Sequence, residues 1–246
     1  MKPWPYPRSI AHRGGGTLAP ENTLAAMRKA RELRFAGVEF DVMLAGDGTP
    51  ILMHDETLDR TTSGSGAIAQ TAFAKIQSLD AGSWFAPRYA GEPVPSFEQA
   101  GKLCVDLELW ANVEIKPAKG YEVATGKSAA LAAKELWRGA PLQPLLSSFR
   151  PEALAAAREA APEVARGALI RSIPPDWERR LEELGCVSLH CDYRMLLPQQ
   201  VRAVRDAGYW VLCYTVNDPA IARVLFDWGV DAIVTDRLNL IAPDFR

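Results

Sequence analysis

Residues 37–54 read GVEFDVMLAGDGTPILMH, and this stretch determines the fold class that the sequence predicts. Its first part, residues 37–44, is an apolar and β-branched run typical of a strand. The link at residues 45–49 has a Gly-Asp-Gly tip and is far too short for a crossover between parallel strands, which needs about a dozen residues or more. We therefore expect residues 50–54 to return antiparallel to residues 37–44 as a hairpin.

Outside this hairpin, short strand-like runs alternate with longer stretches of helical period. Such alternation indicates a parallel sheet with crossover helices. Nine strand-like runs are one more than an eight-stranded barrel holds, and the antiparallel hairpin strand accounts for the extra one. The predicted fold is therefore an α/β TIM (β/α)8-type barrel. The predicted strands are 9–12, 37–44, 50–54, 112–116, 145–149, 167–171, 187–190, 210–216 and 232–235. The predicted helices are 22–35, 97–110, 128–138, 151–160, 176–184, 198–207 and 219–228.

Residues 55–95 interrupt the alternation. They are rich in Thr, Ser, Gly and Pro and show no long helical period. A connection of this length inside a compact domain is usually functional or forms a small inserted lobe. We therefore expect a single barrel domain over residues 1–246, with an insertion at about 55–95 that caps one face of the barrel.

The composition is that of an ordinary globular chain. The 246 residues are 48% hydrophobic and 24% charged, which excludes wholesale disorder. The net charge of −2 argues against nucleic-acid binding, which needs a basic surface. No apolar run approaches the ~18 residues that span a bilayer, and residues 1–8 lack the apolar stretch of a secretory signal. We therefore expect a cytoplasmic protein with no stable membrane insertion.

Three carboxylates occupy strand positions, where an unpaired polar group is costly. Glu39 and Asp41 stand two residues apart and project to the same face, and Glu114 has the same relation to Lys116. If these faces line the barrel mouth, the carboxylates converge and require a cation. Oxygen ligands select a hard ion, so we expect one divalent cation, Mg²⁺ or Ca²⁺. The alternative is a buried salt-bridge set with Arg13 and Lys116.

Two of the three histidines accompany these carboxylates. His12 ends the first predicted strand, and a hairpin turn centred on Asp47 would place His54 opposite Asp41. Two imidazoles beside a metal suit acid–base catalysis, because one can accept a proton while the other protonates a leaving group. We expect the third histidine, His190, to be structural.

Basic groups and glycines next to His12 add an anion-binding character. Arg13 offers a planar fork to phosphate oxygens, Lys116 offers a point charge, and the glycines at 14–16 allow close backbone approach. The phosphate-loop and dinucleotide-binding glycine motifs are absent from the sequence. Together these residues indicate phosphoryl chemistry outside the nucleotide-loop folds.

In their order along the chain, these motifs resemble the glycerophosphodiester phosphodiesterase family over essentially the whole length. The resemblance is greatest to its small cytosolic bacterial members linked to glycerol 3-phosphate uptake. The combined pattern is specific, although each short piece alone is not. The motifs are His12-Arg13-Gly14, Pro20-Glu21-Asn22-Thr23, Glu39-Phe40-Asp41-Val42, His54-Asp55, Glu114-Ile115-Lys116, Ser148-Phe149, Tyr214-Thr215-Val216-Asn217 and Thr235-Asp236.

The resemblance implies metal-dependent hydrolysis of glycerophosphodiesters, such as glycerophosphocholine or glycerophosphoethanolamine, to sn-glycerol 3-phosphate and an alcohol. Its implied site comprises His12 and His54 as the acid–base pair, Glu39, Asp41 and Glu114 as metal ligands, and Arg13 and Lys116 as phosphate contacts. Tyr214 stands where many members have Trp, which leaves the preferred alcohol open. The physiological metal, the base among the two histidines, the nucleophile (water or a substrate hydroxyl) and the oligomeric state also stay open.

Two other functions fit parts of the pattern. A lipid phosphodiesterase resembling sphingomyelinase D or lysophospholipase D shares the fold type and metal chemistry, but the chain shows no secretion signal or disulfide pattern. A non-catalytic glycerophosphodiester-binding module would be expected to have lost the acid–base positions, and both histidines are present. The expected partner is therefore a small-molecule glycerophosphodiester substrate.

Overall fold

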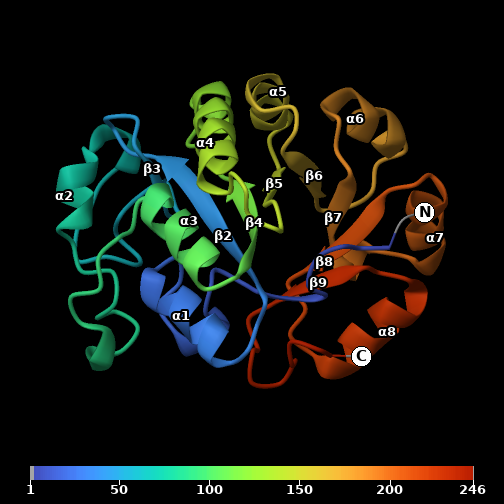
Figure 1. Ribbon diagram of the computed structural model, residues 1–246, viewed down its shortest axis with the longest axis horizontal. Helices are drawn as coiled ribbons and strands as arrows, with labels where there is room; N and C mark the ends of the chain where they lie inside the picture. The colour runs from blue at the N-terminus through green and yellow to red at the C-terminus, as the bar shows by residue number, and fades with distance from the viewer. Residues whose placement is uncertain (1–2, 246) are drawn as a thin grey trace.

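The strands of the chain close into a barrel surrounded by helices (Figure 1). The computed structural model describes residues 3–245. The strands pair in the order β1-β9-β8-β7-β6-β5-β4-β2-β3, and an additional pairing of β1 with β2 closes the ring. β2 and β3 are antiparallel, whereas the other pairings are parallel. Without β3, the ring is the eight-stranded TIM-type barrel that the sequence predicts.

The elements follow one another in the βα order expected of this fold. The strands are β1 Ser9–Ala11, β2 Gly37–Leu44, β3 Pro50–Leu52, β4 Trp110–Ile115, β5 Leu145–Ser148, β6 Ala165–Ile170, β7 Ser188–Asp192, β8 Trp210–Tyr214 and β9 Ala232–Thr235. The α-helices are α1 Leu24–Glu32, α2 Phe73–Gln77, α3 Phe97–Asp106, α4 Glu122–Leu136, α5 Pro151–Ala160, α6 Trp177–Leu184, α7 Pro198–Asp206 and α8 Pro219–Trp228. Within residues 3–245, no helix combines the length and apolar character needed to cross a bilayer.

The predicted elements differ from the observed ones mainly at their ends. The helix predicted to reach Trp110 ends at Asp106, because Glu108 takes a left-handed φ of 54° and Trp110 begins β4. α4 begins at Glu122 rather than at the predicted Ser128. Four elements have the predicted bounds: Gly37–Leu44, Pro151–Ala160, Pro219–Trp228 and Ala232–Thr235.

The hairpin forms as predicted, but its pairing differs by one residue from the expected one. β2 and β3 place Val42 opposite Leu52. The backbone N–H of Met53 donates to the carbonyl oxygen of Asp41 at 3.1 Å. Asp41 therefore faces Met53, and the prediction that it faces His54 is wrong. A turn centred on position 47 pairs residues whose numbers sum to 94, whereas 41 and 54 sum to 95, so His54 follows one residue after the partner of Asp41.

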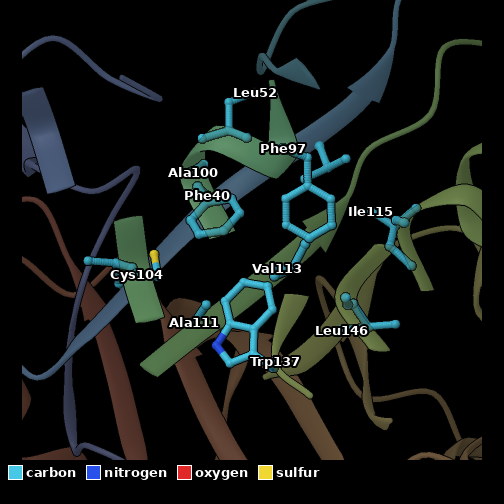
Figure 2. Close-up of a cluster of buried hydrophobic side chains, with 14 of the residues drawn as sticks. Phe40, Leu52, Phe97, Ala100, Cys104, Ala111, Val113, Ile115, Trp137 and Leu146 are labelled. Atoms are coloured by element: carbon cyan, nitrogen blue, oxygen red, sulfur yellow. The ribbon is translucent and has the colours of Figure 1, made fainter. Parts of the chain in front are cut away.

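Side chains on the outer face of β2 hold its inner face in register. Phe40 lies with its ring centroid 6.0 Å from that of Phe97 in α3, and Phe97 lies 6.1 Å from Trp137 (Figure 2). All three rings are at most 1% exposed. Because alternate strand residues face opposite sides, this packing turns Glu39 and Asp41 into the barrel.

Residues 55–95 lie outside the barrel next to β3 and α1 (Figure 1). They contain α2 and two short 3₁₀ helices at Ile68–Gln70 and Pro87–Tyr89. Their apolar residues, including Ile68 and Ile76, share a buried cluster with Met43 and Ile51, which pair with each other in the hairpin. The hairpin strand therefore anchors this segment to the barrel.

Aromatic residues close the N-terminal end of the barrel. The Tyr6 ring stacks on Trp110 at a centroid distance of 4.5 Å, and Trp4 packs edge-on against both rings. Trp110 belongs to a buried cluster with Ile10 and Leu212 inside the barrel. Access to the barrel interior is therefore restricted to the opposite end, where the strands end.

Arg166 in β6 satisfies carbonyl groups near the ends of α5 and α6. It is 5% exposed. Its guanidinium donates to the carbonyl oxygens of Val164 at 2.6 Å and Gly185 at 3.0 Å. Longer hydrogen bonds reach Ala161, Pro162 and Leu184. One side chain thus connects two loops of the barrel.

Replacement of Arg166 by Met is expected to lower the free energy of unfolding by about 2–4 kcal/mol, because buried carbonyls lose their partners. The measurement is urea denaturation followed by circular dichroism. The matched control is Arg138→Met, at an exposed arginine that pairs with Glu135, and we expect a loss below about 0.5 kcal/mol there. Similar losses in both variants would contradict this role of Arg166.

Candidate functional site

The C-terminal ends of β2 and β4 bring the three predicted carboxylates together. Asp41 on β2 pairs in register with Glu114 on β4. One oxygen from each of Glu39, Asp41 and Glu114 lies within 4.8 Å of the other two. Glu39 is 4% exposed and Asp41 is 1% exposed. Three carboxylates in so dry a site need compensating positive charge.

Basic and amide groups supply part of that compensation. The Lys116 Nζ lies 3.3 Å from a carboxylate oxygen of both Asp41 and Glu114. The Arg13 Nε lies 3.7 Å from Asp41 Oδ2, which also accepts a hydrogen bond from Asn22 Nδ2 at 2.8 Å. The salt bridges considered as the alternative to a metal site are therefore present.

These contacts do not neutralise the cluster evenly. Burial first, and then the charge of Asp41, raise the pKa of Glu39 to about 7 and that of Glu114 to about 8. Burial also disfavours ionisation of Asp41, but the charges of Lys116 and Arg13 outweigh it and lower the pKa. Glu39 Oε1 is buried and has no hydrogen-bond partner within residues 3–245. A hard divalent cation fits this all-oxygen set, because it would favour ionisation of all three carboxylates.

Each histidine of the site is oriented by an aspartate. The Nδ1 of His12 lies 2.5 Å from Asp236 Oδ1, and the Nδ1 of His54 lies 2.6 Å from Asp55 Oδ1. An ionised carboxylate can only accept, so Nδ1 carries the hydrogen in both pairs and Nε2 is left for chemistry. The Nε2 of His12 lies 3.8 Å from Glu39 Oε2.

The two imidazoles have pKa values displaced in opposite directions. Burial lowers the pKa of His12, but the hydrogen bond to Asp236 and the charge of Glu39 outweigh it and raise the pKa. Burial lowers the pKa of His54, and attraction to Asp41 offsets this only in part. The protein alone thus makes His12 the more basic imidazole and His54 the less basic one, a difference that acid–base catalysis can use.

Sequence reasoning gave no individual role to Asp236, Asn217 or Asn22. Asn217 Nδ2 donates to Asp236 Oδ2 at 2.9 Å and so fixes the partner of His12. A signal for two of them was available, because Asp236 and Asn217 follow the ends of β9 and β8. Polar residues at the C-terminal ends of barrel strands are the usual source of site residues.

A cavity of about 460 Å³ opens at this end of the barrel. Its walls include His54, Glu114 and Lys116 on one side and Phe149 and Arg150 on another. Phe149 is 43% exposed and presents its ring at the mouth. The cavity therefore joins the carboxylate cluster to a wall that is partly aromatic and partly charged.

Tyr214 lies where the site meets that wall. It lines a recess of about 40 Å³ that also contains His12 and Glu39. Its hydroxyl donates to the carbonyl oxygen of Ile170 at 2.6 Å, and its ring meets that of Phe149 edge-on at 5.8 Å. The side chain is held in place, so it can restrict the shape of what binds.

All of the predicted site residues lie at this mouth, whereas His190 lies deeper in the barrel. Its Nε2 is 2.9 Å from Ser188 Oγ, and the residue is 0% exposed. The residues at the mouth are His12, Arg13, Glu39, Asp41, His54, Glu114 and Lys116.

Known proteins resemble the chain in both sequence and structure. The model of the glycerophosphoryl diester phosphodiesterase family matches residues 12–240. A glycerophosphodiester phosphodiesterase of Caldanaerobacter subterraneus is 33% identical over 92% of this chain and 93% of its own. Another, from Bacillus subtilis, is 32% identical over 94% of this chain and 84% of its own. An Oleispira antarctica phosphodiesterase, solved in complex with the product sn-glycerol-3-phosphate, is 40% identical with a TM-score of 0.88, and the match covers 94% of this chain and 93% of that one.

The buried His190 makes the stability of the barrel depend on pH. Burial lowers its pKa to about 3, whereas an unfolded chain has a histidine pKa of about 6.5. Between these values the unfolded chain binds a proton that the folded protein does not, so acid favours unfolding. From about pH 7 to about pH 4.5 this imidazole is expected to remove roughly 2–3 kcal/mol of stability.

Replacement of His190 by Gln is expected to abolish that part of the pH dependence. The measurement is urea denaturation of both proteins at the two pH values. Groups that titrate equally in both cancel, so the difference isolates the imidazole. Equal pH dependence in the two proteins would show that His190 is not buried in its neutral form.

Proposed function

Since the chain belongs to the glycerophosphoryl diester phosphodiesterase family and is an enzyme of that class, we propose that it releases sn-glycerol 3-phosphate and an alcohol from small glycerophosphodiesters. The observation that carries the proposal is the group of three carboxylates, two buried and one half-buried, with oxygens within 4.8 Å of one another and a histidine–aspartate pair beside it. The product bound to the Oleispira antarctica relative supports the same substrate class.

In the proposed site, Glu39, Asp41 and Glu114 hold one Mg²⁺ or Ca²⁺ ion. A bound cation of this kind polarises phosphoryl oxygens and lowers the barrier to attack at phosphorus. The fit rests on the donor set, which consists of carboxylate oxygens, and on the buried Glu39 Oε1. The raised pKa values of Glu39 and Glu114 also support a bound cation, because they show that Lys116 and Arg13 do not fully compensate the negative charge of the cluster.

The basic side chains bind the phosphodiester in this proposal. Lys116 and Arg13 already lie beside Asp41, and their N–H groups can turn to phosphoryl oxygens that enter the cavity. Charge-assisted hydrogen bonds of this type strengthen as negative charge develops in the transition state.

His12 and His54 carry the protons. One Nε2 removes a proton from the attacking hydroxyl or water, and the other protonates the departing alkoxide. Asp236 and Asp55 keep both rings in the tautomer that this requires. The opposite displacement of their pKa values supports different roles for the two histidines, one as acid and one as base.

Glycerophosphocholine and glycerophosphoethanolamine are the proposed substrates. The cavity of about 460 Å³ accommodates a small polar alcohol, and charged residues such as Lys116, Glu122 and Arg150 make up much of its wall. These charged groups favour a small polar diester over the lipid substrates of the alternative function. Phe149 offers the alcohol an aromatic face, which suits a quaternary ammonium group.

Replacement of His12 or His54 by Ala is expected to lower kcat by ~10²–10⁴, the usual contribution of an acid–base group. The measurement is release of glycerol 3-phosphate from glycerophosphocholine at saturating substrate and metal. Thermal unfolding of each variant controls for misfolding. Near-normal turnover in both folded variants would overturn the acid–base assignment.

Removal of divalent cations by a chelator is expected to abolish activity, and Mg²⁺ or Ca²⁺ should restore it. Because Glu39 and Glu114 are partly protonated near pH 7 and pH 8, cation binding should release protons and should tighten as pH rises through this window. Calorimetric titration in PIPES and in Tris measures the release, since these buffers differ in ionisation enthalpy. Cation affinity that does not change with pH, without proton release in wild-type protein, would contradict binding at this cluster.

A further inference from the structure

Arg60, in the segment that follows the hairpin, forms two forked contacts with carboxylates. Its Nη1 and Nη2 donate to the two oxygens of Glu21 at 2.7 and 2.8 Å. Its Nε and Nη2 donate to the two oxygens of Asp55 at 2.6 and 3.0 Å. The planar guanidinium uses two of its edges, a geometry that an ammonium group cannot reproduce.

The same two carboxylates also bind residues of the proposed site. Asp55 Oδ1 lies 2.6 Å from the Nδ1 of His54. Glu21 Oε1 accepts a hydrogen bond from Arg13 Nη1 at 2.6 Å. A continuous chain of charged hydrogen bonds therefore runs from His54 through Arg60 to Arg13.

Charge keeps both carboxylates in the form that this chain needs. Burial would raise the pKa of Glu21, but hydrogen bonds from Arg60 and Arg13 outweigh it and lower the pKa. The hydrogen bond from Arg60 holds the pKa of Asp55 well below its usual range. Both carboxylates are therefore ionised. An ionised Asp55 can only accept hydrogen bonds, so His54 and Arg60 are the donors.

The contribution of these ion pairs to folding stability does not explain the arrangement. The Arg60 side chain is 44% exposed and that of Asp55 is 29% exposed, and ion pairs of such exposure contribute little to folding. Orientation is the stronger effect. Within residues 3–245, the hydrogen bonds to the Asp55 side chain come from His54 and Arg60. Without Arg60, His54 is the remaining hydrogen-bond partner of the Asp55 side chain among the described residues, and a single contact leaves the carboxylate free to rotate.

We propose that Arg60 is a positioning residue of the phosphodiesterase reaction, through which the segment 55–95 orients both His54 and Arg13. The proposal rests on the functions proposed above for these two residues. Arg60 acts on proton transfer through Asp55 and on phosphate binding through Glu21. Through Arg60, the segment contributes to the orientation of the site although it lies outside the barrel.

Replacement of Arg60 by Gln is expected to lower kcat by ~10–100-fold, as loss of an outer-shell partner commonly does. KM for glycerophosphocholine should rise several-fold, since Glu21, the hydrogen-bond partner of Arg13, is no longer held by Arg60. Arg60→Lys should show a similar loss of kcat, because lysine keeps the positive charge but cannot form the two forked contacts. If Arg60→Gln does not fold, Arg60→Lys serves as the test variant. Wild-type kcat in folded Arg60→Gln and Arg60→Lys would overturn the proposal.

The matched control is Arg88→Gln in the same segment. Arg88 is exposed and lies over the Tyr89 ring, 4.9 Å from its centroid. We expect this variant to keep wild-type kcat and KM. An equal loss of kcat in Arg88→Gln would show that the segment responds to any loss of charge, and would overturn a specific effect of Arg60.

A mutant cycle separates positioning from a general structural effect. If Arg60 acts on kcat through His54, adding Arg60→Gln to His54→Ala should lower kcat by less than about twofold, since coupled residues are non-additive. The same large loss in both backgrounds would overturn action through His54. Near-normal kcat in His54→Ala would overturn the proposed acid–base function as well, whereas a large loss there with wild-type Arg60→Gln kinetics would overturn the proposal for Arg60 alone.

Discussion

The close approach of three carboxylates on the neighbouring strands β2 and β4, two of them buried, is the constraint on which the site depends. Like charges cannot share a dry site unless cations or protons compensate them. The positions of Lys116 and Arg13, each beside Asp41, follow from this requirement. The apolar packing of Phe40 outside the barrel is equally necessary, because it prevents β2 from turning its carboxylates toward the helices. A slip of one residue would destroy core and site together.

Much of this arrangement is predictable, because it depends on local pattern. Residues 38–42 alternate apolar and acidic side chains with a period of two, so the direction of each side chain follows from its position. The tight turn after Leu44 requires an antiparallel return, and that single inference reconciles the strand count with a closed barrel. The starts of α5 and α8 are also predictable, because Pro151 and Pro219 suit the first turn of a helix.

What the sequence does not show depends on contacts between distant segments. Arg60 is one of two arginines in residues 55–95, a segment without periodicity, and only folding brings it to Glu21, 39 positions earlier. The early start of α4 is another case, because Gly126 argues against a helix. A Cβ at that glycine would lie 2.2 Å from the carbonyl oxygen of Ala153, so close packing on α5 explains it. Local propensity was overridden by tertiary contact.

The closed N-terminal end of the barrel has a consequence for turnover. Trp4, Tyr6 and Trp110 block that end with packed rings, so the cavity at the other end serves as both entrance and exit. Two products of one cleavage must leave through the opening by which the next diester arrives. In the proposed reaction, accumulated sn-glycerol 3-phosphate would then compete with substrate for Arg13 and Lys116. In a barrel with one opening, the rate of turnover therefore depends on how quickly other reactions consume the product.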